Sequence, residues 1–266
     1  KKEETHNAEY WGLADMTTAK DSKTKLKHLT IPFNSNVDDI FKNKYLSPRP
    51  PYTTLQIPAQ GIGEWCLPKK TAEINDSAYR ATIVDNIFDT KQGVTFASPA
   101  NGNNIAYTSL WDNYPDSIDV AAKGKGHQAW LLMAGSTNNM QSRIDNGVVT
   151  AMYADGSSDT LRLRNPENWC PIEQDYYTDG LAFSTVQPRP YRIHLGSGMV
   201  SRDLYGDLMS QGIIKKHTRT AEQNIIPDGA AQMLNMKLNP NKKLKCFRIK
   251  TLSNEVVIGV MAISIE

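Results

Sequence analysis

The sequence has few cysteines, no long apolar run and no excess of charge of one sign. Its three cysteines, Cys66, Cys170 and Cys246, are far apart and form no CxxC pair, so the ligand spacing of thiolate zinc sites is missing. They fit either one disulfide with a free thiol or three reduced, buried thiols, and the second arrangement is the simpler one. Thirty basic against 28 acidic residues give a net charge of +2, which provides no global field for nucleic acid. No stretch reaches the ~18 apolar residues of a membrane span, so none is predicted.

Several enzyme motifs are missing as well. The sequence has no Walker A loop, no GxGxxG after a predicted strand, no HExxH pair and no nucleophile elbow. The five histidines are isolated from one another, so we predict neither a metal nor a cofactor. The chain begins Lys1-Lys2-Glu3-Glu4 with no apolar segment behind it and no initiator methionine, which indicates a processed or truncated chain.

The first 51 residues differ in character from the rest. Residues 1–26 are polar and charged, and a short apolar run at 29–33 predicts a first strand. The apolar spacing over residues 37–45 predicts one short helix, which the proline-rich segment 47–51 ends. We therefore expect a polar leader with one short helix over residues 1–51 and a β-sandwich domain over residues 52–266.

The second part of the chain is rich in short strand-like runs separated by Pro, Gly, Asn or Asp. These runs cover residues 53–57, 62–67, 79–84, 93–97, 104–109, 117–122, 127–134, 231–238, 244–251 and 256–265. Residues 149–164 alternate apolar and polar side chains around Asp155-Gly156, which predicts a hairpin with a tight turn. A second short helix is expected over residues 202–211, ended by Gly212. The pattern predicts a mainly β protein, a sandwich of the jelly-roll kind with one or two short helices.

Two loops concentrate aromatic and polar side chains. The first runs from Trp111 to Asp116, and the second is a long irregular segment that includes residues 169–177. Flat aromatic rings beside carboxylates and amides suit sugars, which combine apolar faces with many hydroxyls. Arg143 adds a bidentate donor. The candidate carbohydrate-binding residues are Trp111, Asp112, Asn113, Tyr114, Arg143, Trp169, Glu173, Asp175 and Tyr176.

Two other interpretations remain open. A glycoside hydrolase could use a pair of carboxylates among Glu64, Asp112, Glu173 and Asp175, because that reaction needs an acid and a base or nucleophile beside the scissile bond. Alternatively, the aromatic residues only cover the ends of the core, and the domain packs against a catalytic neighbour.

Some of these segments resemble known families. The run Trp130–Thr137, the hairpin Tyr153-Ala154-Asp155-Gly156-Ser157 and Leu161-Arg162-Leu163 resemble jelly-roll modules of the galactose-binding-like and NPCBM type. Residues 165–177, together with 111–116 and 254–259, resemble an uncharacterised domain-of-unknown-function family from bacterial polysaccharide-utilisation proteins.

The resemblance implies a galactose-binding-like fold and a non-catalytic accessory role in a secreted or periplasmic glycan-degrading protein. The implied partners are a glycan and a catalytic domain of a larger protein. It implies no catalytic residue.

Overall fold

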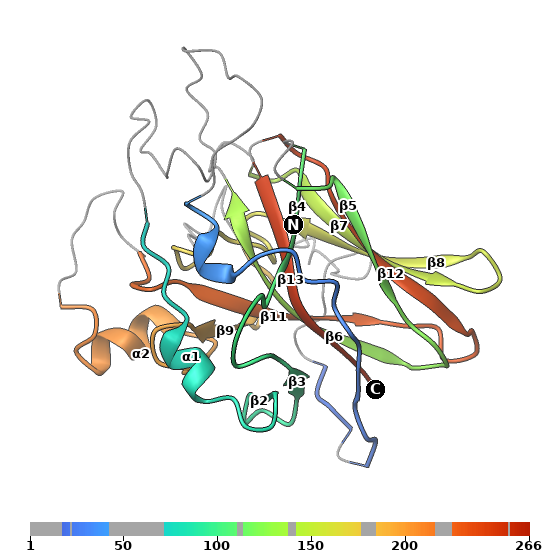
Figure 1. The fold of residues 1–266 in the computed structure, drawn as a ribbon, viewed down its shortest axis with the longest axis horizontal. Coiled ribbons are helices and arrows are strands. Elements are labelled where there is room, and N and C mark those ends of the chain that lie inside the picture. Colours follow the sequence, from blue (N-terminus) through green and yellow to red (C-terminus); the bar gives the residue numbers. More distant parts are fainter. Residues whose placement is uncertain are drawn as a thin grey trace, which may run out of the picture.

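Two antiparallel sheets pack against each other in the computed structural model (Figure 1). The structure describes residues 18–21, 23–42, 72–110, 114–137, 142–176, 185–215, 225–254 and 256–266. Within these residues the helices are few and short, so the predicted mainly β, sandwich-like fold is confirmed.

A sheet of seven strands, here called the large sheet, forms the middle of the molecule. Its strands follow the order β1 (Lys27–His28), β13 (Val256–Ile265), β6 (Gln128–Thr137), β11 (Ala230–Lys237), β9 (Tyr191–His194) and β10 (Val200–Ser201), while β4 (Ala106–Ser109) also pairs with β13. The small sheet has the order β5 (Ser117–Ala121), β12 (Leu244–Thr251), β7 (Asp145–Tyr153) and β8 (Ser158–Arg164). The predicted hairpin is the β7–β8 pair, and Gly156 takes the positive φ of 86° that its turn requires.

The main apolar core lies between the two sheets. Phe247 and Ile249 of β12 point into it, whereas Arg248 and Lys250 alternate with them and are exposed. Such alternation is expected of a sheet with one buried and one solvated face. The small sheet therefore has an outer face that is open to solvent.

The large sheet is buried on both faces. Leu131 and Met133 of β6 pack in the core between the sheets, while Trp130 and Leu132 pack in a second core on the opposite face. The second core is covered by η1 (Val37–Asp39), α1 (Ser77–Ala81), β2 (Ile87–Asp89) and β3 (Thr95–Ala97), which lie away from the small sheet in Figure 1. This explains why β6 and β13 are apolar without alternation.

The structure confirms one of the predicted local elements and contradicts or shortens two others. Helix α2 (Leu204–Ser210) is present as expected and is followed by Gly212 at φ 72°. The strand predicted over residues 79–84 is wrong, because Ser77–Ala81 form α1. The helix predicted over residues 37–45 is only the 3-10 turn η1 in its described part.

Part of the segment interpreted as a leader packs on the sandwich. Strand β1 pairs with β13, and Val37, Ile40 and Phe41 are buried in the second core. Residues 43–71, which contain the predicted boundary and the first two strand-like runs, lie outside the described residues.

Candidate functional site

The predicted ligand residues fall into two groups, one at an end of the sandwich and one inside it. Tyr114 is half-buried, with its ring 5.2 Å from that of Tyr107, and Arg143 is exposed. Four others have almost no exposed surface: Trp169, Glu173, Asp175 and Tyr176. Trp111, Asp112, Asn113 and the alternative carboxylate Glu64 lie outside the described residues.

Trp169 belongs to the core between the sheets. Its side chain is fully buried, and its Nε1 donates a hydrogen bond of 2.7 Å to Oγ1 of Thr137 at the end of β6. Gly135 leaves room for the indole, because a Cβ there would lie 2.6 Å from Cζ2 of Trp169. No sugar ring can stack on the indole in this arrangement.

Apart from Trp169, the buried candidate residues lie around Arg192 of β9. Its guanidinium is fully buried and donates to the carbonyl oxygens of Gln174 at 2.8 Å and Ala230 at 3.0 Å. It also lies 2.6 Å from Sγ of Cys170 and 3.5 Å from Oδ1 of Asp175. A buried charge needs this kind of full pairing, so the cluster fixes the segment around residues 170–176 against the large sheet.

The two buried carboxylates are not arranged to act on a substrate. Asp175 accepts hydrogen bonds from the backbone N–H of Tyr176 and, at 3.4 Å, from that of Tyr205, besides its ion pair with Arg192. Burial raises the pKa of Glu173 to about 8, against the smaller lowering effect of Arg192. Glu173 is therefore neutral at pH 7 and stays covered by protein.

The nearby thiol of Cys170 is unreactive. Burial raises the pKa of Cys170 to about 12, and Arg192 only partly offsets this. Because the thiolate is the reactive form, Cys170 is no nucleophile in this environment. Cys170 and Cys246 are both free and buried, which agrees with the reduced thiols expected for these two positions.

The other group lies at the end of the sandwich where β4, β6 and β12 finish and β5, β7 and β13 begin. We call the surface formed here by residues 110, 114–116, 142–144 and 252–254 the loop end. Its loops are joined by backbone hydrogen bonds: Thr251 donates to Asp116, and Leu252 donates to Asn146 at 2.9 Å. Ser253 Oγ donates to the carbonyl of Asp145 at 2.9 Å.

The loop end carries exposed apolar side chains. Among the described residues, the exposed large apolar side chains are Val84, Leu110, Ile144, Ile213 and Leu252. Leu110, Ile144 and Leu252 are between 42% and 46% exposed and come from three different loops of the loop end. Sequence reasoning missed them, because a single aliphatic residue beside a strand is usually part of the core.

Arg143 has an unusual backbone conformation. Its φ is 60°, in the left-handed region that residues other than Gly rarely adopt. Its N–H donates a hydrogen bond of 2.7 Å to the carbonyl of Asn165, which holds it there. Strained residues of this kind are often found at binding sites.

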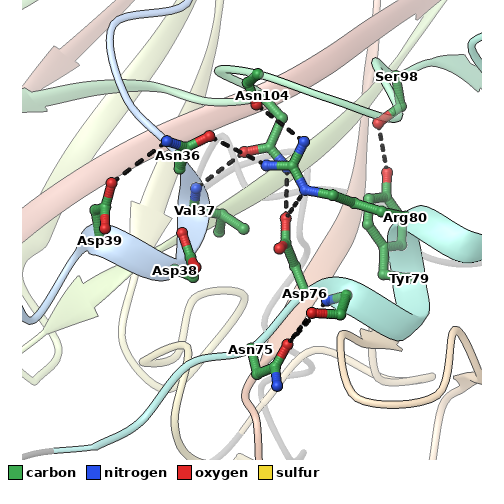
Figure 2. A network of polar contacts seen from close by, with 12 residues as sticks. Asn36, Val37, Asp38, Asp39, Asn75, Asp76, Tyr79, Arg80, Ser98 and Asn104 are labelled. Atoms are coloured by element: carbon green, nitrogen blue, oxygen red, sulfur yellow. Dashed lines mark hydrogen bonds and ion pairs between the residues drawn. The ribbon is translucent and has the colours of Figure 1, made fainter.

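A second polar network lies on the far side of the large sheet (Figure 2). Asp76 Oδ2 accepts hydrogen bonds from Nε of Arg80 at 2.8 Å and from Nδ2 of Asn104 at 2.7 Å. Asn104 Oδ1 in turn accepts from the N–H of Val37 at 2.9 Å, and Arg80 reaches Oδ1 of Asn36 at 3.2 Å. These groups satisfy one another and fasten α1 and η1 together. The i, i+4 spacing of Asp76 and Arg80 is the sequence signal that the strand prediction overlooked.

The described residues contain no cluster of His, Cys, Asp and Glu that could hold a metal ion. The same part of the chain contains no helix that is long and apolar enough to cross a membrane. Neither a family model nor a curated protein sequence matches the chain.

Proposed function

We propose that this chain is a non-catalytic carbohydrate-binding or accessory module of a secreted or periplasmic glycan-degrading protein, with the loop end as its contact surface. The observation that carries the proposal is the convergence of three loops at one end of the sandwich. They bring Arg143 to the same end as three exposed apolar side chains and the half-buried Tyr114, whose ring packs on Tyr107 of the second core.

The composition of these loops suits a sugar. Trp111, Asp112 and Asn113 belong by sequence to the loop between β4 and β5, next to Leu110 and Tyr114. An indole and a phenol provide apolar faces for sugar C–H groups, while carboxylate and amide groups bind hydroxyls. Arg143 adds donors on the neighbouring loop.

The buried group supports the non-catalytic part of the proposal. A glycosidase needs two carboxyl groups that flank the scissile bond. Glu173 and Asp175 are 2% and 4% exposed, and Asp175 is engaged by Arg192 and by backbone N–H groups. Their positions suit a structural role.

The test is binding of the purified chain to an array of plant, host and microbial glycans. We expect the wild-type chain to bind one glycan class, and Trp111→Ala and Arg143→Gln to weaken that binding about tenfold or more. Ile144→Ala should weaken it too, whereas the matched control Ile213→Ala, an exposed Ile outside the loop end, should not. An array on which the wild-type chain binds nothing, or on which Trp111→Ala binds as tightly, would contradict the proposal.

A second candidate function rests on the aliphatic character of Leu110, Ile144 and Leu252. Exposed apolar patches often mark protein interfaces. In this alternative the loop end packs against a catalytic domain of the same protein. A chain that binds no glycan, but whose association with that domain is lost in Ile144→Asp and Leu252→Asp, would favour it.

A further inference from the structure

Segment 164–169, which is buried except for the half-buried Arg164 and Glu167, contacts both ends of the loop that carries Arg143. At the first end, Trp169 donates its Nε1 hydrogen bond to Oγ1 of Thr137, the last residue of β6, at 2.7 Å. Both side chains are buried, so neither can exchange this partner for water. A buried donor or acceptor that loses its partner is costly, which makes this bond an effective anchor.

At the second end, three contacts join the same segment to residues 142 and 143. The carbonyl of Asn165 accepts from the N–H of Arg143 at 2.7 Å, and Nδ2 of Asn165 donates to Oγ of Ser142 at 3.3 Å. A guanidinium nitrogen of Arg164 donates to the carbonyl of Arg143 at 3.2 Å. Both backbone polar groups of Arg143 are thus bound to one short segment.

We propose that Trp169 and Asn165 are positioning residues, which hold Arg143 in its left-handed conformation at the loop end. The proposal rests on the proposed function, in which Arg143 contacts the ligand. Trp169 then serves binding from inside the core, through Thr137, without touching the sugar. Left-handed backbone at a non-Gly residue persists only where its surroundings impose it, and this segment provides those surroundings.

The test is limited proteolysis of the folded chain by trypsin, with the cleaved bonds identified by mass spectrometry. Trypsin cuts after Arg143 only when this segment opens locally, so the cleavage rate reports how firmly it is held. Thr137→Val removes the acceptor of Trp169 with little change of shape, and Ser142→Ala removes the acceptor of Asn165. We expect each variant to be cut after Arg143 about three- to tenfold faster than the wild-type chain.

Lys91 provides an internal reference site. It is exposed, basic and left-handed like Arg143, with φ 59°, but it lies in the β2–β3 turn. Its cleavage rate should stay unchanged in Thr137→Val and Ser142→Ala. The control variant Ser98→Ala removes a different buried hydrogen bond, the 2.9 Å contact with the hydroxyl of Tyr79, and should leave cleavage after Arg143 unchanged.

Two results would overturn the proposal. One is an unchanged rate after Arg143 in both Thr137→Val and Ser142→Ala. The other is a rate that rises equally at Arg143 and Lys91, since that indicates a general loss of stability. If Thr137→Val fails to fold, Ser142→Ala decides, because Ser142 is not buried.

A second experiment measures glycan binding, and it tests whether the held conformation of Arg143 matters for the ligand. A glycan that the wild-type chain binds on the array should bind Thr137→Val and Ser142→Ala more weakly, by about the factor measured in proteolysis. Unchanged affinity in variants that are cut faster would show that Arg143 is held but does not serve binding. Failure of the proposed function is distinct, because the wild-type chain would then bind no glycan, while the proteolysis would still decide whether the segment holds Arg143.

Discussion

The buried residues around Arg192 carry almost no net charge, because Glu173 keeps its proton. The guanidinium is paired with Asp175 and with backbone carbonyl oxygens. A second negative charge on Glu173 would have little left to pair with, because Arg192 is already surrounded. Burial therefore keeps Glu173 protonated, as its pKa of about 8 indicates.

This raised pKa makes stability depend on pH in a defined direction. The folded chain keeps the proton of Glu173 up to about pH 8, while the unfolded chain releases it near 4.5. The contribution of the neutral carboxyl is complete below pH 4.5 and is lost as the pH rises towards 8, by an amount on the order of 4 kcal/mol. Glu173→Gln should remove this dependence and be more stable than the wild-type chain at pH 8.

Urea unfolding at pH 5, 6.5 and 8 measures the effect. The control is Glu73→Gln, which changes an exposed carboxyl and should follow the wild-type profile. A Glu173→Gln profile parallel to that of the wild-type chain would show that Glu173 is ionised in the folded state.

Residue types alone could not show that Trp169 and Tyr176 are buried while Arg143 is exposed. An aromatic ring beside carboxylates suits a core as well as a sugar. The difference arises from Arg192 and Gly135, which are distant in sequence and create the space and the charge partner for the segment between them. Such long-range partners leave no local pattern.

At the scale of elements, periodicity predicted the longer strands well but missed the short strands β2, β9 and β10. It also placed a first strand over residues 29–33, where the structure has β1 at Lys27–His28 instead. The hairpin around Gly156 and the continuous apolar runs of β6 and β13 are strong signals, because each reflects how many faces are buried. Helix α1 has only five residues and is stabilised by contacts such as that between Asp76 and Asn104, so its apolar pattern is too short to identify it.

Glycines in two elements should respond in opposite ways to the same substitution. In β6, a Cβ on Gly135 would collide with the carbonyl oxygen of Val257 and lie 2.6 Å from Trp169, and neither can move. Gly135→Ala should therefore lower the free energy of unfolding by about 3 kcal/mol or more. In α2, a Cβ on Gly206 would meet only the exposed carboxylate of Asp203, which can rotate away.

Gly206→Ala should consequently be neutral or stabilise the chain by up to about 1 kcal/mol, the difference in helix propensity. Thermal and urea unfolding of both variants measure the contrast. Equal effects of the two substitutions would mean that β6 can shift away from Trp169.

At the scale of the whole molecule, the sandwich includes residues before the predicted boundary. Leu29 and Ile31 are buried between the sheets, while Val37, Ile40 and Phe41 fill the second core. Burying such side chains contributes about 1.5–3 kcal/mol each as an upper range.

A truncation tests this dependence. A chain that begins at residue 43 should lose at least about 3 kcal/mol of stability relative to one that begins at residue 18, and should bind a dye for exposed apolar surface. Urea unfolding and dye fluorescence of the two chains give the comparison. Equal stability would mean that residues 18–42 are a separable leader.

The burial of the large sheet on both faces also restricts how this protein can change over time. Positions along β6 and β13 are packed on either side, so substitutions there must fit a closed space at every residue. Along β12, by contrast, Arg248 and Lys250 face solvent, so core packing does not restrict these positions. The outer face of the small sheet is thus where the sequence can drift, and where the protein can acquire a new surface charge without altering its shape.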